Sequence, residues 1–387
     1  MQDAVYLDNS ATTPVLPQVW ARVQAAMAEG YFNPSAAYAP AAAAERALDA
    51  CRSALRGALG ARDYGVIFTS GGTEADALAL LGLAGARRGP MAFYCSAVEH
   101  PAVRQAMAAL ATHGHSVAQL PVDERGVLDI RRCEAALGED AALVSVMQVN
   151  NETGAVQPLA ALRALMRARC PRALLHVDGV QGFLRVPIAL QRDGVDMYTL
   201  SAHKVHGPKG CGALLVRPGV RLAPLIPGGG QEGGLRGGTE NTPGILGLHA
   251  AVDALRGMPD LAVALAARKA RLWMLLHQGD GALAVNGPLP VDAESAPHIL
   301  NVSFPGVGGE VMLHALESRG VYVSTGSACS SRREKHSAVL AAMGLSGDRL
   351  DSAIRFSLSP LNTDEEIAFA AQAALALYAQ LKDYRRR

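Results

Sequence analysis

The stretch Ser201-Ala202-His203-Lys204 follows an apolar run, Val195 to Leu200, and precedes a turn-forming cluster, His206 to Gly210. A lysine just beyond a buried strand, among small and polar neighbours, is suited to a Schiff base with a cofactor aldehyde. Upstream, the strand-like run Leu174 to Val177 ends at a carboxylate, Asp178. Such a carboxylate can keep a pyridine nitrogen protonated, so that the ring accepts electrons. The pair predicts an enzyme that uses pyridoxal phosphate (PLP), although the lysine alone is equally typical of a surface residue.

Short apolar runs alternate with longer helical patterns over the first part of the chain. Runs without polar alternation, separated by helices, predict a mostly parallel sheet with helices on both faces. Ligands bind such sheets at the C-terminal strand ends, where Lys204 and Asp178 both fall. The seven predicted strands lie at 66–68, 92–94, 117–120, 143–149, 174–177, 195–200 and 213–216.

The pattern changes after Val216, where a Gly- and Pro-rich stretch, 224–238, is followed by one predicted long helix, 243–278. Further strands are expected at 298–304, 321–323 and 354–358, with helices at 309–319, 336–343 and 363–382. We therefore expect an α/β protein of two domains. The large PLP-binding domain would span 15–255, and the small domain would combine 1–14 with 256–387.

Composition argues against several classes of protein. The 387 residues include 36 basic and 35 acidic ones, for a formal net charge of +1. This balance gives no long-range field that would attract nucleic acid or an anionic membrane. The six cysteines contain no CxxC pair, so neither a zinc site nor a disulfide framework is indicated. With no secretory signal and no transmembrane run, we expect a cytoplasmic protein without a metal site.

A short stretch with two adjacent glycines and a threonine suggests a phosphate site. The stretch Thr69 to Glu74, which contains Gly72 and Thr73, lies between a predicted strand and a predicted helix. Glycines let backbone amides approach an anion, and the positive end of the helix dipole favours negative charge. A plain capped turn with Thr73 as N-cap is the alternative. Together with Lys204 and Asp178 in the same sheet, phosphate binding is favoured.

Polar residues at other strand ends are candidates for the same site. His100 opens a predicted helix and could lie over a flat ring and handle protons, unless it is a solvated loop residue. Asn150 and Asn151 end another strand; one is expected to form only a turn, whereas the other would contact a ligand. Gln181 lies three residues after Asp178 and would be close to the same ring.

Two further residues suggest a substrate and a nucleophile. Arg355 is a charge inside an apolar strand, which suits a bidentate contact with a substrate carboxylate unless it faces solvent at a sheet edge. The small, polar stretch Ser324 to Ser331 contains Cys329, and a basic segment, 332–335, follows it. Nearby positive charge favours the thiolate. Cys329 is therefore a candidate nucleophile, with a chance loop cysteine as the alternative.

These stretches together resemble the cysteine desulfurases of the NifS/IscS type, within the fold-type I, class V aminotransferase-like PLP enzymes. The resemblance extends over nearly the whole chain, and the cysteine stretch separates desulfurases from other members of the superfamily. The matching stretches are Tyr6 to Pro14, Phe68 to Glu74, Glu99-His100, Val149 to Gly154, His176-Val177-Asp178, Ser201 to Lys204, Arg236 to Asn241, Ser324 to Ser331 and Ile354 to Ser357.

The resemblance implies a homodimer that converts L-cysteine to L-alanine and passes the sulfur, through a persulfide on Cys329, to an acceptor protein. The acceptor would serve Fe–S cluster assembly or the synthesis of other thio-compounds, such as thiolated tRNA, and Cys329 would contact an Fe–S cluster only transiently. The resemblance implies that Lys204 forms the Schiff base, Asp178 contacts the pyridine nitrogen, Gln181 contacts the phenolic oxygen and His100 stacks on the ring; with Lys204 and Cys329, His100 would be a catalytic residue. The implied phosphate ligands are Gly72, Thr73, Ser201 and His203, and Thr239 would reach the phosphate of the neighbouring subunit. Asn151 and Arg355 would bind the substrate carboxylate, and Asn151 would also lie beside the cofactor.

The sequence departs from the family pattern at non-catalytic positions. Tyr38 and Ala41 replace a common His and Gly, Gly233 replaces an Arg, and the segment Lys335 to Ala338 replaces a Glu-Pro-Ser-His pattern. Two alternatives to a desulfurase stay open at this point. One is a related PLP lyase or transaminase, such as a selenocysteine lyase, with Cys329 incidental. The other is a catalytically idle scaffold for Fe–S assembly.

Overall fold

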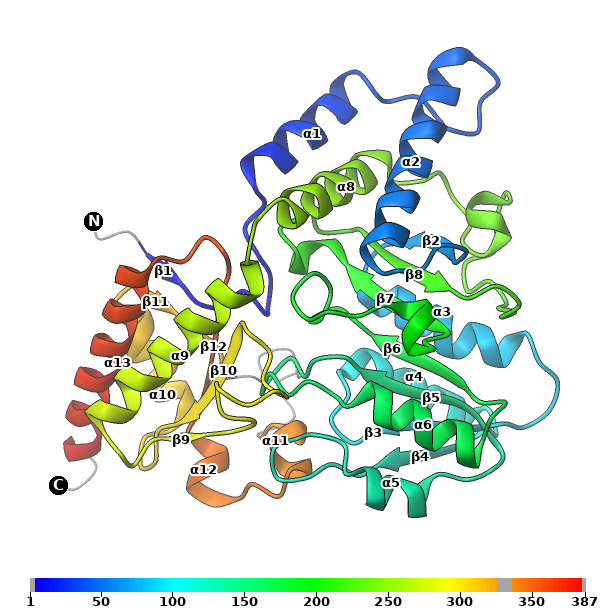
Figure 1. Cartoon of the computed structure of the whole chain (residues 1–387). Coiled ribbons are helices and arrows are strands. Elements are labelled where there is room, and N and C mark those ends of the chain that lie inside the picture. Colours follow the sequence, from blue (N-terminus) through cyan, green and yellow to red (C-terminus); the bar gives the residue numbers. More distant parts are fainter. Residues whose placement is uncertain (1–3, 326–335, 385–387) are drawn as a thin grey trace.

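A computed structural model of the chain describes residues 4–325 and 336–384. Cys329 lies outside the described residues, as does the whole basic segment 332–335 that follows it. Within the described ranges the chain forms two α/β units (Figure 1), one around a large sheet and one around two small sheets.

The large sheet has seven strands in the order β2-β8-β7-β6-β5-β3-β4. Only β8 is antiparallel to its neighbours β2 and β7, so the predicted mostly parallel sheet is confirmed. The strands are β2 (Gly65–Thr69), β3 (Ala92–Ser96), β4 (Ser116–Leu120), β5 (Ala141–Met147), β6 (Leu174–Asp178), β7 (Met197–Ser201) and β8 (Gly212–Val216).

Helices cover both faces of this sheet because its central strands are apolar on both sides. Every residue of β5 is buried, and successive residues point to opposite faces: Leu143 packs with Leu78 and Val103, whereas Val144 packs with Leu55 and Leu162. One face carries α3 (Gly72–Gly85) and α4 (Pro101–Thr112). The other carries α2 (Ala39–Ala58), α5 (Ile130–Ala136), α6 (Leu159–Arg169), α7 (Leu190–Asp193) and α8 (Thr242–Arg256), and α1 (Pro17–Ala28) packs on α8.

The second unit has its own core, in which Leu272, Phe304, Phe356 and Tyr378 are fully buried. Its larger sheet is antiparallel, in the order β12-β10-β9, and β1 near the N-terminus pairs with β11. The strands are β1 (Val5–Tyr6), β9 (Ala284–Val285), β10 (Ile299–Ser303), β11 (Val321–Tyr322) and β12 (Ala353–Ser357). The helices are α9 (Leu261–Gly279), α10 (Gly309–Ser318), α12 (Gly347–Asp351) and α13 (Asp364–Tyr384), whereas α11 (Ala338–Ala342) packs on the core of the large unit.

The prediction of one helix over 243–278 is wrong. The structure has two helices, because the chain breaks after α8 and α9 begins at Leu261. Pro259 falls in the break, and Asp260 adopts the left-handed conformation with φ of 53°. Proline lacks the amide hydrogen and restricts the residue before it, so it ends helices. The break turns the chain from the large sheet toward the second unit (Figure 1).

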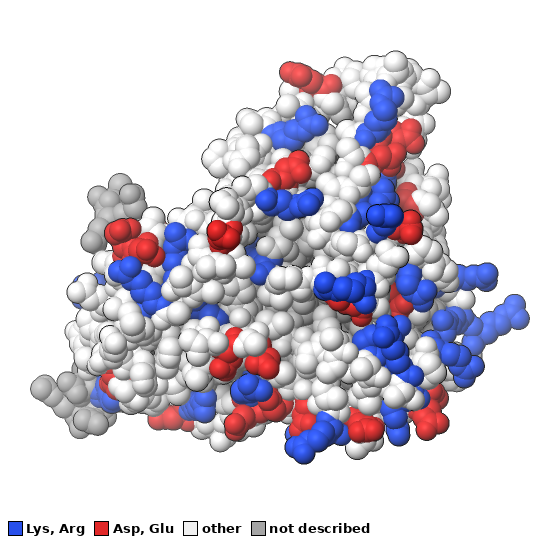
Figure 2. Space-filling view, in the orientation of Figure 1, with Lys and Arg blue, Asp and Glu red and all other residues white. Residues whose placement is uncertain are grey.

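The molecular surface carries both signs of charge. On the face shown in Figure 2, basic and acidic side chains are interspersed over most of the area, which agrees with a net charge of +1. Within the described residues, no helix has both the length and the apolar character needed to cross a membrane.

Candidate active site

A cavity of about 260 Å³ lies at the C-terminal ends of the central strands of the large sheet. Residues from the second unit and from the N-terminal segment close it, because Arg355 of β12 and Ser10 are part of its wall. The cavity brings together ten of the residues predicted from the sequence: Gly72, Thr73, His100, Asn151, Asp178, Gln181, Ser201, His203, Lys204 and Arg355.

Lys204 is held at the cavity wall by backbone carbonyls. It ends the 3₁₀ turn Ala202–Lys204 that follows β7, and its Nζ donates to the carbonyls of Ser10 (2.6 Å) and Ala11 (2.8 Å). Its own carbonyl accepts a hydrogen bond from the guanidinium of buried Arg185. The N-terminal segment thus orients the Lys204 amine, and this contact was not predicted from the sequence.

Asp178 is buried at the end of β6, where its Oδ1 accepts a hydrogen bond from the Val180 amide at 2.9 Å. Burial raises the pKa of Asp178 to about 6, although the Val180 amide and the charge of Lys204 lower it. The side chain is therefore mainly a carboxylate at neutral pH, which is the form that would accept a hydrogen bond from a protonated ring nitrogen.

Asp76, on α3, is a second buried carboxyl group at the same cavity and was missed by the sequence argument. Its Oδ1 lies 3.6 Å from Nε2 of buried His176. Burial and the nearby charge of Asp178 raise the pKa of Asp76 well above its usual value, which favours its protonated form. An aspartate one turn after Thr73, followed in the helix by apolar residues only, was the signal available in the sequence.

The predicted phosphate site lies at the start of α3. There is no room for a side chain at Gly72, because a Cβ would lie 2.8 Å from Val180 Cγ2. The helix N-terminus and Thr73 therefore meet the cavity at close range. His203 lies beside them, and burial with the charges of Lys204 and Lys209 lowers its pKa to about 4.

His100 caps α4, with its Nδ1 accepting a hydrogen bond from the Ala102 amide at 3.1 Å. Burial, Lys204 and Arg104 lower the pKa of His100 to about 4. The prediction that His100 handles protons assumes the near-neutral pKa of a free imidazole, and that assumption is wrong here because the ring is buried and lies near two cations, Lys204 and Arg104. A neutral ring is suited to stacking on an aromatic ligand and to accepting a proton only transiently.

Glu99, which precedes His100, is a fully buried carboxyl group. Its Oε1 accepts hydrogen bonds from the Ser96 hydroxyl and from the amide of Met147 at 2.9 Å, and Met147 lines the cavity. Burial raises the pKa of Glu99 from 4.5 to about 8. The folded protein therefore keeps a proton that the unfolded chain releases, so the free energy of unfolding falls as pH rises from 4.5 to about 8.

Glu99→Gln is expected to flatten this pH dependence, because glutamine keeps the shape and the acceptor oxygen but does not ionise. Between pH 4.5 and about 8, the ionisation of Glu99 should lower the free energy of unfolding by an amount on the order of a few kcal/mol. Urea unfolding of both proteins across that pH range measures it, with the exposed Glu139→Gln as control. Equal slopes for the wild type and Glu99→Gln would show that Glu99 is not the group responsible.

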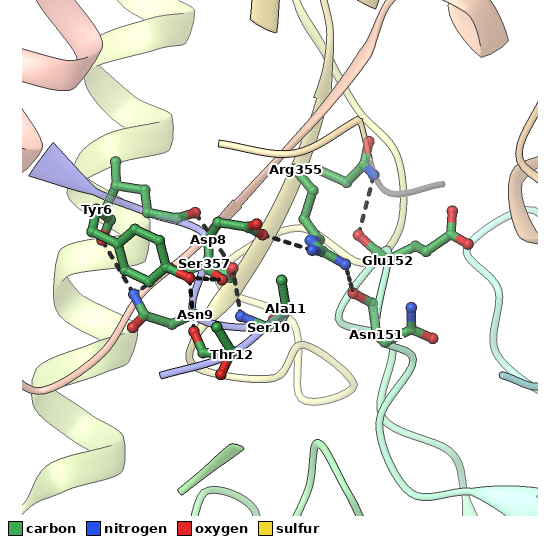
Figure 3. A network of polar contacts seen from close by, with 12 residues as sticks. Tyr6, Asp8, Asn9, Ser10, Ala11, Thr12, Asn151, Glu152, Arg355 and Ser357 are labelled. Carbon is green, nitrogen blue, oxygen red and sulfur yellow. Dashed lines mark hydrogen bonds and ion pairs between the residues drawn. The ribbon is translucent and has the colours of Figure 1, made fainter. Parts of the chain in front are cut away.

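Arg355 is buried, with 4 % of its surface exposed, so the alternative of a solvent-facing edge arginine is wrong. Its Nη2 pairs with Asp8 Oδ1 at 2.8 Å, and its Nη1 donates to the Asn151 carbonyl at 2.9 Å (Figure 3). Its Nε is buried and has no hydrogen-bond partner among residues 4–325 and 336–384. Asp8 was not predicted, and it orients the guanidinium beside the cavity.

The residues of the cavity fit PLP. Among the described residues, five buried polar atoms of the wall have no hydrogen-bond partner: Ser10 Oγ, Asp76 Oδ1, Asn151 Oδ1, Gln181 Oε1 and Arg355 Nε. Buried polar groups need partners, and a flat ligand with ring and phenolic polar atoms supplies them. The wall also offers a helix N-terminus for a phosphate, a carboxylate for a ring nitrogen and an amine for an aldehyde.

The structure does not place two of the predicted site residues in the wall of the cavity. Thr239 is exposed in the Gly-rich loop and does not line the cavity. Cys329 lies outside the described residues. Their roles therefore stay predictions from the sequence.

Comparison with known proteins gives matches over nearly the whole chain. The family model described as aminotransferase class V matches residues 5–369. A protein of Gluconacetobacter diazotrophicus named cysteine desulfurase is 40% identical, over 98% of this chain and 95% of its own. A solved structure of a NifS-like protein superposes with a TM-score of 0.89 and 34% identity, over 97% of this chain and 100% of its own.

A further solved structure, titled SspA in complex with cysteine, has a TM-score of 0.81 and 32% identity, and covers 92% of this chain and 99% of its own. Sequence and fold thus both match over more than nine-tenths of the chain. The chain therefore belongs to the class V aminotransferases, a family of PLP-dependent enzymes, and within it to the cysteine desulfurases of the NifS/IscS type.

Proposed function

We propose that the chain converts L-cysteine to L-alanine with PLP as cofactor and transfers the sulfur to Cys329 as a persulfide. The observation that carries the proposal is the single cavity that joins Lys204, Asp178 and the start of α3 to Arg355. The likeness to a structure titled as a complex with cysteine supports L-cysteine as the substrate.

The cofactor would be held by residues already on the cavity wall. Asp178 would meet the ring nitrogen, His100 the ring face and Gln181 the phenolic oxygen. The phosphate would lie at the start of α3, where Gly72 leaves room, with Ser201 and His203 beside it. When bound, PLP withdraws electrons from the substrate and so weakens the bonds at Cα and Cβ.

The chain's own residues would bind the substrate and move its protons. Arg355 and Asn151 would hold the carboxylate, using the buried Nε of Arg355 in addition to the two nitrogens already engaged. The Lys204 amine would take the Cα proton. The thiolate of Cys329 would take the substrate sulfur, so that the Cβ–S bond breaks, an S–S bond forms and a proton replaces sulfur on Cβ.

Arg355→Lys is expected to raise KM for L-cysteine about 10- to 100-fold with a smaller change in kcat. Lysine keeps the positive charge but lacks the planar set of N–H donors that can bind a carboxylate through two hydrogen bonds. Steady-state kinetics of alanine formation measure this. Arg192→Lys, at an exposed arginine that pairs with Asp193, is the matched control. A fall in kcat at unchanged KM would place Arg355 outside the carboxylate site.

A homodimer is part of the proposal. Thr239 is exposed and does not line the cavity of its own chain, so its side chain is free of that cavity and could contact the cofactor phosphate of a second subunit. Trp20, Met27, Tyr31 and Tyr38 are exposed large apolar side chains within one stretch of the chain, and burial against a second copy would remove them from water. Sedimentation of the purified protein tests this, and a monomer at micromolar concentration would contradict it.

The sulfur would pass from Cys329 to an acceptor protein for Fe–S cluster assembly or for other thio-compounds. A reducing cytoplasm is the compartment that we propose, since the five described cysteines are all buried and unpaired. The intact pair of Lys204 and Asp178 on one cavity argues against an idle scaffold.

A further inference from the structure

Lys269 is a buried lysine outside the cavity. It lies on α9 with 1 % of its surface exposed, and its Nζ donates to Ser295 Oγ at 2.6 Å and to the Ala296 carbonyl. Across residues 4–325 and 336–384, no carboxylate is within salt-bridge distance of it. A buried cation without a counter-ion costs free energy, and burial lowers the pKa of Lys269 to about 7. Both of its hydrogen bonds go to one segment of the chain, which also carries Asp292, whose charge partly offsets the effect of burial on the pKa of Lys269.

That segment, 292–296, docks on the large unit through its backbone. The amide of Ala296 donates to the Gly154 carbonyl at 2.8 Å, and the amide of Val156 donates to the Glu294 carbonyl at 2.7 Å. Ser295 forms a β-bridge with Ala155 between these two bonds. The two groups that Lys269 holds are therefore at the centre of this contact.

The contacted turn, 150–154, is held together by hydrogen bonds. The Asn150 side-chain oxygen accepts hydrogen bonds from the amides of Glu152 and Thr153, both at 2.9 Å, and the Asn150 carbonyl accepts one from the Gly154 amide at 3.0 Å. Gly154 closes the turn with φ of +75°, and a Cβ there would lie 2.9 Å from the Ile299 carbonyl oxygen. Because these bonds connect the two ends of the turn, we expect a displacement of Gly154 to shift Asn151 as well.

The turn carries Asn151 into the cavity. Its side chain lines the wall, and its carbonyl accepts the 2.9 Å hydrogen bond from Arg355 Nη1 (Figure 3). We propose that Lys269 is a positioning residue for the substrate-carboxylate site, which it fixes by holding segment 292–296 against this turn. The kinetic part of this inference rests on the proposed function, because it takes Arg355 and Asn151 as ligands of L-cysteine.

The test compares Lys269→Met, which keeps the length but removes the donors, with Lys269→Arg and with the surface control Lys382→Met on α13. In Lys269→Met we expect KM for L-cysteine to rise about tenfold, with kcat and the affinity for PLP nearly unchanged. Lys269→Arg should recover most of the loss, because it can donate to the same oxygens. Lys382→Met should behave as the wild type.

Amide hydrogen exchange gives a readout that does not depend on activity. In Lys269→Met, exchange at Gly154 and Val156 should accelerate selectively, whereas the turn at 217–220 at the far end of β8 should be unchanged. If Lys269→Met does not fold, Ser295→Ala removes one acceptor of the same contact and should produce the same pattern more weakly. Unchanged exchange at 154–156, or an equal change throughout the protein, would overturn the inference. Absence of L-cysteine turnover in the wild type would refute the proposed function instead, and the exchange result would still decide the role of Lys269.

Discussion

Lys204→Ala is expected to lower kcat for alanine formation from L-cysteine by about 10³-fold or more, since the variant lacks the amine that would bind the cofactor and move the Cα proton. The visible absorption of the lysine-bound cofactor should also disappear. The fold should survive, because the two hydrogen bonds that Nζ donates to carbonyls contribute only about 1 kcal/mol each.

The matched control for this variant is Lys209→Ala, at an exposed lysine in the turn that follows. It should keep both the absorption and the turnover of the wild type. If Lys204→Ala binds PLP with an unchanged spectrum and forms alanine at the wild-type rate, Lys204 is not the cofactor lysine and the assignment of the cavity is wrong.

Cys329→Ser is expected to abolish persulfide formation and turnover, because a serine hydroxyl does not accept sulfur from the substrate. The absorption of bound PLP should be unchanged, since the proposed cofactor ligands are elsewhere. The other cysteines do not offer a substitute nucleophile. Burial raises the pKa of all five described cysteine thiols, so they are protonated at neutral pH: Cys51, Cys95, Cys133, Cys170 and Cys211.

Persulfide and alanine should be measured after a single turnover with L-cysteine, with Cys170→Ala as the control for the loss of one thiol. Sulfide production that persists unchanged in Cys329→Ser would assign the chain to the lyase alternative. In that case Cys329 is incidental, and selenocysteine should be tested as the substrate.

The large sheet and most of the cavity could be predicted from the sequence for one physical reason. Buried parallel strands read as uninterrupted apolar runs, and their C-terminal ends meet at one edge of the sheet. Polar residues directly after such runs, such as Asp178, His100 and Asn151, therefore had to lie close together. The structure places them on one wall.

The features of the site that could not be predicted from the sequence depend on contacts between residues far apart in the chain. The carbonyls of Ser10 and Ala11 that hold Lys204 are backbone groups, which carry no signal in the side-chain pattern. Asp8 meets Arg355 only because the N-terminal segment crosses to β12. The low pKa of His100 likewise follows from burial beside Lys204, which strand patterns do not report.

One error was avoidable from local sequence alone. Pro259, two residues after Gly257 and directly before Asp260, is a clear helix-breaking signal, although the residues on both sides of it follow a helical pattern of apolar positions. The pairing of β1 with β11 was not predictable in the same way, because each strand is two residues long and the partners are more than 300 positions apart.

The identity of the carbon product tests the central claim most directly. Purified, PLP-loaded protein should convert L-cysteine to L-alanine, in an amount equal to the sulfur transferred or released. Pyruvate with ammonia would contradict the claim, because those products arise by elimination without a sulfur-accepting cysteine. A protein that binds PLP but forms neither product would contradict the proposed function as a whole.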